Sequence, residues 1–256
     1  MKEIQSVHNP LVQSLRALQK AKGRRESGLF LAEGSKLVGE ALELGLCRTL
    51  LVQQDGFEQH RLLVEAAERA GCGVLSVSEA VMQAVCETKT PQGIVCVAAM
   101  KPEAEALCGE LIVALDGVQD PGNVGTIVRT ADAAGFGGVL LGDGCADLFS
   151  PKALRATMGS ALRMDVRRAD DLAEALEAMR SRGYAVASTE LGGEDFYAHC
   201  PRERAVLVIG SEGRGVSDAV RAVCTHHLAL PMRGGAESLN AAVAAGIMMY
   251  EMARGR

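Results

Sequence analysis

Two patterns of apolar residues alternate along this chain. Uninterrupted apolar runs are typical of buried strands, whereas apolar residues that recur every three or four positions are typical of amphipathic helices. In the first hundred residues these patterns predict strands at 28–34, 48–53, 73–78 and 93–100. They predict helices at 10–21, 35–45, 58–71 and 78–88. The alternation indicates a small α/β unit.

The rest of the chain repeats this alternation with more strongly apolar strands. Strands are expected at 111–116, 137–142, 162–166, 183–189, 205–210 and 227–231. Helices are expected at 124–135, 151–159, 170–183, 216–223 and 238–254. Continuous apolar strands with helices between them predict a parallel sheet covered on both faces. The charged, proline-containing segment 100–110 breaks the pattern, so we expect one domain over residues 1–104 and another over 105–256.

Composition narrows the class of protein. The 256 residues are 48% apolar and 3% aromatic, which is enough for a sizeable core but poor for aromatic base stacking. No run of 18 uncharged apolar residues occurs, and the N-terminus lacks an apolar signal core, so we expect a cytoplasmic protein without a membrane span. The eight cysteines have no C-x-x-C spacing and are expected to be reduced thiols. The neighbouring His226 and His227 should point to opposite faces of a strand, so no metal site is expected.

The charge is unevenly distributed. The net charge of −5 argues against a basic coat, yet residues 1–25 carry six basic side chains and one acidic one. Such an arm suits a local contact with a polyanion, although a solvated helix face would have the same composition. The candidate RNA-binding residues are Arg16, Lys20, Lys22, Arg24 and Arg25.

Three polar loops, DGVQDPGN, GSEGRGVSD and PMRGGAESLN, follow predicted strands. Ligands of parallel sheets bind at the carboxyl ends of strands, where these loops should meet. The glycines of the second loop could expose backbone N–H groups to an anion, but Glu212 would repel a phosphate and the Walker lysine is missing. A neutral or cationic ligand fits better, and S-adenosylmethionine is one. In the third loop Ser238 is a candidate N-cap, and Gly234 and Gly235 leave room for a flat ring.

Other common sites lack support in the sequence. G-x-S-x-G, the nucleophile elbow of α/β hydrolases, is absent, and so is the dinucleotide-binding pattern G-x-G-x-x-G. Taken together and in order, the segments D-P-G-N-V-G-T-I-V-R-T-A, I-G-S-E-G-R-G and L-P-M-R-G-G-A-E-S-L-N-A-A-V-A-A resemble the three motifs of the SpoU (TrmH) family of RNA ribose 2′-O-methyltransferases. The resemblance spans about residues 111–254. The shorter stretch F-L-A-E-G-S-K-L-V-G-E-A-L resembles the substrate-binding domain that many members carry.

The resemblance implies a SPOUT fold, which is α/β with a trefoil knot, and a homodimer that binds S-adenosylmethionine in the knot. By position, it implies that the catalytic residues are Asn123, Arg129, Glu212, Ser238 and Asn240. It implies that the cofactor-binding residues are Thr189, Gly210, Leu230, Met232, Ser238 and Leu239. The chain departs from the family where Ala241 and Ala242 follow the asparagine, since the family has a valine or serine there, and we expect little consequence within a helix.

In this interpretation the first loop holds a ribose beside the methyl donor. Arginine is almost always protonated, so Arg129 is expected to stabilise a developing alkoxide and position a phosphate, although a role as base stays open. Asn123 would orient the arginine or the ribose, and Glu212 would hold Arg129 in place. Ribosomal RNA is the expected substrate, and transfer RNA is the alternative. Base methylation and a non-catalytic RNA-binding role are the other hypotheses.

Overall fold

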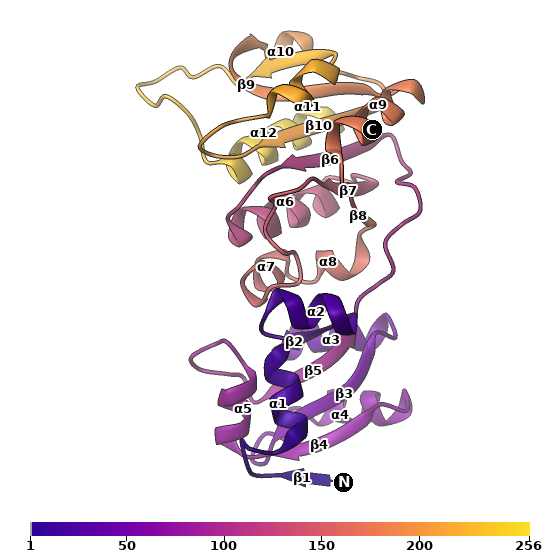
Figure 1. Ribbon diagram of the computed structural model, residues 1–256, viewed down its shortest axis with the longest axis vertical. Coiled ribbons are helices and arrows are strands. Elements are labelled where there is room, and N and C mark those ends of the chain that lie inside the picture. Colours follow the sequence, from indigo (N-terminus) through magenta and orange to yellow (C-terminus); the bar gives the residue numbers. More distant parts are fainter. Residues whose placement is uncertain (1) are drawn as a thin grey trace. The chain divides into compact units, whose positions relative to one another are not determined.

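The computed structural model describes residues 2–256, which form two compact units (Figure 1). The first unit contains the chain up to Pro102 together with Phe149–Arg163. The second contains Glu103–Leu148 and Met164–Arg256. Segment 149–163 thus belongs by its contacts to the first unit, although its neighbours in the sequence on both sides belong to the second.

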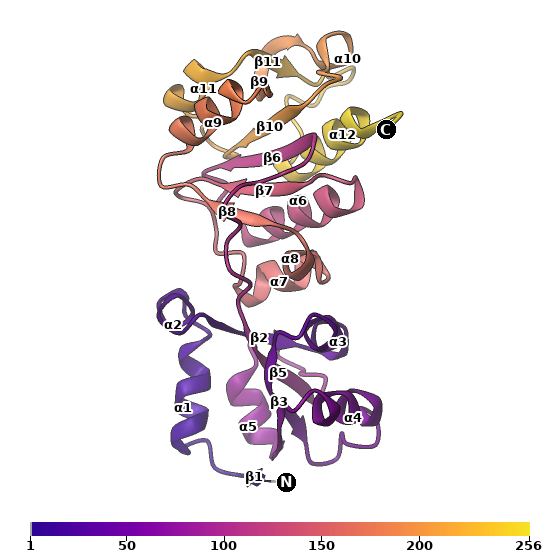
Figure 2. The ribbon, with the colours of Figure 1, turned by 90° about the vertical axis from the view of Figure 1, so that its right-hand side faces the viewer.

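The first unit is built on a five-stranded sheet in the order β1-β4-β3-β5-β2. Its strands are β1 Lys2–Ile4, β2 Leu29–Glu33, β3 Cys47–Gln53, β4 Gly73–Val77 and β5 Ile94–Ala99. Strands β1, β4 and β3 run parallel, while β5 is antiparallel to both β3 and β2. Its helices are α1 Pro10–Ala17, α2 Ala21–Ser27, α3 Ser35–Glu43, α4 Arg61–Arg69, α5 Glu79–Val85, α7 Pro151–Thr157 and α8 Ser160–Arg163. Figure 2 shows α1 and α5 on one face of this sheet and α3 and α4 on the other.

Segment 149–163 is held to the rest of the first unit by an aromatic contact and ion pairs. The rings of Phe149 and Phe30 lie 5.0 Å apart, and Phe30 is fully buried. The guanidinium of Arg155 lies 3.9 Å from the Glu33 carboxylate and 3.3 Å from that of Glu87. These contacts explain why the segment clusters with β2 and its neighbours.

The second unit contains a six-stranded sheet in the order β11-β9-β10-β6-β7-β8, and every neighbouring pair is parallel. Its strands are β6 Leu111–Asp116, β7 Gly138–Leu141, β8 Val166–Arg168, β9 Ala185–Asp195, β10 Ala205–Gly210 and β11 His226–Ala229. Its helices are α6 Pro121–Ala133, α9 Leu172–Ser181, α10 Phe196–His199, α11 Asp218–Val223 and α12 Ala241–Ala253. Helices α9 and α11 cover one face, and α6 and α12 cover the other (Figure 2). The predicted parallel sheet with two covered faces is confirmed.

The predicted strand at 162–166 was wrong, since Leu162 and Arg163 end helix α8 and β8 begins only at Val166. The backbone is left-handed at Met158 and Gly159, with φ of 50° and 99°, and this turn separates α7 from α8. The predicted helix 10–21 ends early, because α1 stops at Ala17 and α2 begins only at Ala21, and the short elements β1, α2 and α10 were not predicted. The spacing of apolar residues along the sequence does not reveal where one helix ends and the next short element begins.

Strands β9 and β11 do not pair evenly. His227 is paired with Ser188, but Leu228 is paired with Glu194, so residues 189–193 leave the ladder. A Cβ on Gly193 would lie 2.5 Å from the carbonyl oxygen of His227, so only glycine allows this approach. The irregularity places Thr189 and its neighbours at the carboxyl edge of the sheet.

The α/β fold class that the sequence predicted is confirmed, while the trefoil knot itself stays a prediction. Across residues 2–256, the helices are too short or too polar to cross a membrane.

Candidate functional site

The candidate site lies at the carboxyl edge of the parallel sheet in the second unit. Strand β6 ends at Asp116, β10 at Gly210 and β11 at Ala229, and the three polar loops follow them. Because the strands are parallel, their carboxyl ends meet at one edge. The carboxylate of Asp116 accepts a hydrogen bond of 2.6 Å from the backbone N–H of Ser217, which ties the first loop to the second.

Asn123 joins all three loops. It lies in the first turn of α6, where the side chain of Asp120 caps the helix by accepting from its backbone N–H at 3.0 Å. Its side-chain amide donates to the carboxylate of Glu212, and its side-chain oxygen accepts from the amide of Asn240 at 3.1 Å. Three predicted catalytic residues from distant parts of the sequence therefore form one hydrogen-bonded chain.

Arg129 does not take part in the hydrogen bonds that connect Glu212, Asn123 and Asn240. The expectation that Glu212 holds Arg129 in place was therefore wrong. Arg129 lies six residues after Asn123 in α6, which places it roughly 9 Å further along the helix and on a different face. Its side chain is exposed, and within residues 2–256 it has no hydrogen-bond or ion-pair partner. It is thus free to meet a ligand from outside the unit.

Asn240, and not Ser238, is the N-cap of α12. Its side-chain oxygen accepts hydrogen bonds from the backbone N–H groups of Ala242 and Val243, at 3.0 and 3.3 Å. The predicted cap at Ser238 was wrong because the helix begins only at Ala241. Ser238 instead stays in the exposed loop and lines the cavity described next.

A cavity of about 840 Å³ opens beside the three loops. All six residues predicted to bind the cofactor line it: Thr189, Gly210, Leu230, Met232, Ser238 and Leu239. Its size falls within the range of small-molecule sites, roughly 300–1,000 Å³. The second loop folds back closely on its own start, because a Cβ on Gly210 would lie 2.2 Å from the carbonyl carbon of Gly215. Only glycine fits there.

The cavity's chemistry fits S-adenosylmethionine. Leu230, Met232 and Leu239 offer apolar surface for a flat ring, and the carboxylates of Glu190, Glu212 and Glu237 suit a cationic sulfonium. The residues that would hold this cofactor lie chiefly in the three loops and in residues 189–193, where β9 leaves its ladder with β11.

Sequence reasoning missed Glu190, Leu191 and Gly192, which also line the cavity. They belong to the stretch in which β9 leaves its ladder with β11. The adjacent glycines Gly192 and Gly193, which follow an apolar strand, are the signal that could have revealed it.

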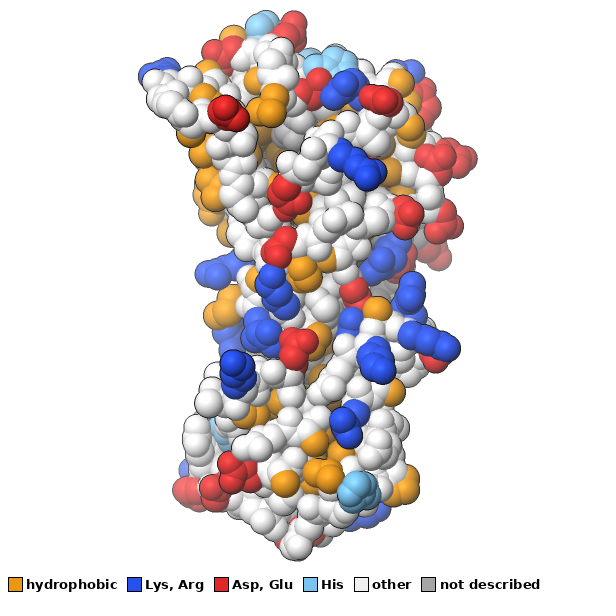
Figure 3. Space-filling view, turned by 60° about the vertical axis from the view of Figure 1, so that its left-hand side comes forward, with side chains coloured by type: hydrophobic (Ala, Val, Ile, Leu, Met, Phe, Trp, Pro, Cys, Tyr) orange, Lys and Arg blue, Asp and Glu red, His pale blue; other side chains and the backbone are white. Residues whose placement is uncertain are grey.

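The predicted RNA-binding residues lie on α1, α2 and the turn between them. Arg16, Lys20, Lys22 and Arg25 are exposed. The prediction for Arg24 was wrong: this side chain is 3% exposed, and its guanidinium donates to the carbonyl of Leu18 at 2.7 Å. On the face drawn in Figure 3, Lys and Arg side chains lie among Asp and Glu side chains and form no continuous basic coat.

The fold and the site define an α/β protein with a small-molecule cavity at the carboxyl edge of a parallel sheet, bordered by polar side chains from three loops. Residues 110–250 match the SpoU rRNA Methylase family, and residues 9–96 match the MRM3-like substrate binding domain. The chain belongs to the SpoU rRNA methylase family. The resemblance seen in the sequence is confirmed, and with it the class, an RNA methyltransferase that uses S-adenosylmethionine.

Relatives match along nearly the whole chain. The 23S rRNA (guanosine(2553)-2′-O)-methyltransferase RlmP of Bacillus subtilis is 39% identical over 98% of this chain and 99% of its own length. The crystal structure of an AdoMet-bound rRNA methyltransferase from Sinorhizobium meliloti has a TM-score of 0.86 and 36% identity, over 99% and 97% of the two chains. The SpoU methyltransferase AviRb from Streptomyces viridochromogenes in complex with AdoMet has a TM-score of 0.85 and 28% identity, over 96% and 98%.

Proposed function

We propose that this protein transfers a methyl group from S-adenosylmethionine to a ribose 2′-hydroxyl of ribosomal RNA. The observation that carries the proposal is the hydrogen-bonded chain of Glu212, Asn123 and Asn240 beside the cofactor cavity. The relative from Bacillus subtilis, named for 2′-O-methylation of a 23S rRNA guanosine, supports both the ribose and the class of RNA. On the same ground we propose a cytoplasmic enzyme that takes part in rRNA processing.

The residues of the chain divide the work. When bound, S-adenosylmethionine supplies a methyl group on a sulfonium sulfur, which leaves as a neutral thioether. Asn123 and Asn240 fix the three loops so that the ribose hydroxyl is presented in line with that methyl group. Because Arg129 lies on a different face of α6 from Asn123 and does not line the cavity, we assign its exposed guanidinium to the part of the RNA outside the cavity. There it positions the phosphate next to the reacting ribose, and its charge stabilises the oxygen as the proton leaves to water. We favour electrostatic stabilisation over a role as base, because arginine side chains in proteins are almost always protonated.

The first unit binds the RNA. The match to a substrate-binding domain over residues 9–96 supports this role, and so do the exposed basic residues Arg16, Lys20, Lys22 and Arg25. These side chains lie along α1, α2 and the turn between them, where they can contact phosphates without reading bases.

The protein works as a homodimer. Helix α12 exposes Val243, Ile247 and Tyr250, which are 51%, 38% and 56% accessible. The spacing of four and three residues places them on one side of the helix. An apolar stripe of this kind on a folded unit suits burial against a second copy of the chain.

The test is a methylation assay with labelled S-adenosylmethionine and RNA from cells that lack the protein. The RNA is divided into ribosomal and transfer pools, digested and analysed for labelled nucleosides. We expect label on a 2′-oxygen in the ribosomal pool. Label on a base would overturn the ribose chemistry, and label only in the transfer pool would overturn the substrate class.

A further inference from the structure

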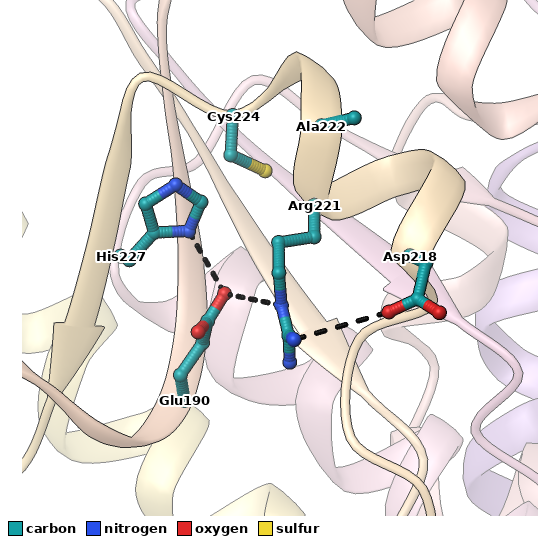
Figure 4. Close-up of a pocket in the computed structure, with 6 residues that line it drawn as sticks. All are labelled: Glu190, Asp218, Arg221, Ala222, Cys224 and His227. Carbon is teal, nitrogen blue, oxygen red and sulfur yellow. Dashed lines mark hydrogen bonds and ion pairs between the residues drawn. The ribbon is translucent and has the colours of Figure 1, made fainter.

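Glu190 lies on the wall between two hollows of the second unit. It lines the cofactor cavity, and it also lines a smaller pocket of about 440 Å³ together with Asp218, Arg221, Ala222, Cys224 and His227 (Figure 4). In Figure 4 the side chains of Arg221 and His227 both point toward its carboxylate. Glu190 follows Thr189 in the stretch where β9 leaves its ladder with β11.

One oxygen of Glu190 receives three hydrogen bonds. Oε1 accepts from the hydroxyl of Ser188 at 2.8 Å, from Nδ1 of His227 at 2.8 Å and from Nε of Arg221 at 3.1 Å. Ser188 is fully buried, and the side chain of Glu190 is 15% accessible. Burial by itself opposes ionisation, but the bonds from Ser188 and His227 and the charge of Arg221 outweigh it, so the pKa of Glu190 is lowered.

The other oxygen, Oε2, is left available. Within residues 2–256 it has no hydrogen-bond partner, because every bond to this carboxylate ends on Oε1. The described part of the chain also contains no fully buried side-chain oxygen or nitrogen without a partner, so Oε2 is accessible from outside. An ionised oxygen that is held rigidly and left open is a strong acceptor for an N–H or O–H group.

The neighbouring acidic groups have other partners or face solvent. Glu212 is engaged by Asn123, and Asp218 is fully exposed and lies 3.9 Å from Arg221. Arg221 is therefore shared between Asp218 and Glu190, and its Nε end is the one directed at Glu190. This leaves Glu190 as the carboxylate on the cavity wall that is fixed in place by three side-chain donors.

We propose that Glu190 binds the cofactor directly, with Oε2 accepting a hydrogen bond from S-adenosylmethionine. Of the cofactor's donors, the ribose hydroxyls and the cationic α-ammonium group are better partners for an ionised oxygen than the neutral 6-amino group of adenine, and we assign the contact to one of these two. Ser188, His227 and Arg221 are positioning residues that hold the carboxylate ionised and oriented. The inference rests on the cofactor assignment and adds a contact that the three sequence motifs do not contain.

Binding of S-adenosylhomocysteine, measured by calorimetry without RNA, tests the proposal. Glu190→Gln keeps the shape of the side chain but removes its charge, and we expect the Kd to rise at least tenfold. The matched control is Asp218→Asn, which removes a charge from the second pocket only and should change the Kd less than twofold. Equal Kd values for wild type and Glu190→Gln would overturn the inference. If the wild type itself failed to bind, the proposed cofactor would be wrong as well.

Two analogues of S-adenosylhomocysteine identify the donor, one lacking the ribose hydroxyls and one lacking the α-amino group. We expect one of them to bind the wild type at least tenfold more weakly than S-adenosylhomocysteine does, and this difference should disappear in Glu190→Gln. If Glu190→Gln does not fold, Glu190→Asp keeps the charge on a shorter stem and should reduce the same difference. Analogues that bind the wild type as well as the parent compound would overturn the proposal in either case.

Discussion

The guanidinium of Arg129 is solvent exposed on α6, and within residues 2–256 no side chain neutralises it. Asn123, on the same helix, is engaged at both ends of its amide. Arg129 is thus available to a ligand, whereas Asn123 maintains the arrangement of the three loops. A variant of Arg129 should therefore separate turnover from cofactor binding.

We expect Arg129→Ala to lower the rate of methyl transfer by roughly 10²–10³, which is typical of losing one charged group that stabilises a transition state. The Kd for S-adenosylhomocysteine should stay within twofold, because Arg129 does not line the cavity. Single-turnover assays and calorimetry measure the two quantities. A variant that kept its rate would exclude Arg129 from the mechanism.

Glu190 should make stability depend on pH in a defined direction. Its folded-state pKa is lowered, so the ionised form stabilises the fold fully above the ordinary value of 4.5. This contribution is lost as the pH falls through the lower, folded-state value. In urea unfolding near neutral pH, the free energy of unfolding of the wild type should be about 1 kcal/mol higher than that of Glu190→Gln. The gap should stay constant down to about 4.5 and narrow below it, and a gap that stayed constant in stronger acid would contradict the geometry.

Helix α12 combines two roles. Its N-terminus is capped by Asn240, which reaches the active-site chain, and its outer side carries Val243, Ile247 and Tyr250. Pairing of two copies through that side would therefore be coupled to the position of the third loop.

Ile247→Glu should convert the proposed dimer into a monomer, since it places a charge in the middle of the apolar stripe. Light scattering would then give the mass of one chain, 26.9 kDa, in place of twice that value. The control is Leu62→Glu on α4, where a leucine is 72% accessible and no stripe is proposed. If both variants kept the mass of the wild type, α12 would not be the interface.

The basic residues of α2 allow the proposed RNA contact to be tested. Charge reversal of Lys22 and Arg25 should weaken RNA binding by an order of magnitude or more at low salt and reduce its salt dependence by about two counterions. The matched control reverses Arg61 and Arg69, which are 64% and 70% exposed on α4 and give the same change in charge. Equal losses from both pairs would mean that only the net charge matters.

Sequence patterns predicted most strands and helices because periodicity is local, and they failed where distant contacts decide. Ser238 and Asn240 are equally suitable caps in sequence, and the route of the third loop selects Asn240. Arg24 looks like its basic neighbours, but the turn from α1 to α2 buries it. Glu190 gave no signal of its own, since the uneven pairing of β9 with β11 creates its environment.

The division of the protein into two units does not follow the order of the sequence. Segment 149–163 lies within the stretch that matches the methylase family, yet its contacts belong to the first unit. Within this segment, Phe149 packs against the ring of Phe30, and Arg155 forms an ion pair with Glu33. The first unit is therefore incomplete without a piece of chain that follows far behind it.

A fragment of residues 1–102 should be less stable than the same fragment joined by a flexible linker to residues 149–163. Loss of the partner of a buried phenylalanine costs about 3 kcal/mol or more, so the melting temperature should fall by at least 10 °C. The control is the same joined fragment with the two substitutions Phe149→Ala and Arg155→Glu in the linked segment. This variant should be no more stable than the fragment of residues 1–102 alone. Identical melting of the short and the joined fragments would contradict the division.

The pairing of β10 with β6 affects how the protein is made. These two strands are neighbours in the sheet but lie far apart in the chain, and β10 also pairs with β9. During synthesis β6 leaves the ribosome long before its partner exists, so one apolar edge waits unpaired. The cavity is completed later still, because Asn240 and Met248, at the start of α12 and within it, also line it. A nascent polypeptide therefore cannot bind its cofactor before α12 has been synthesised.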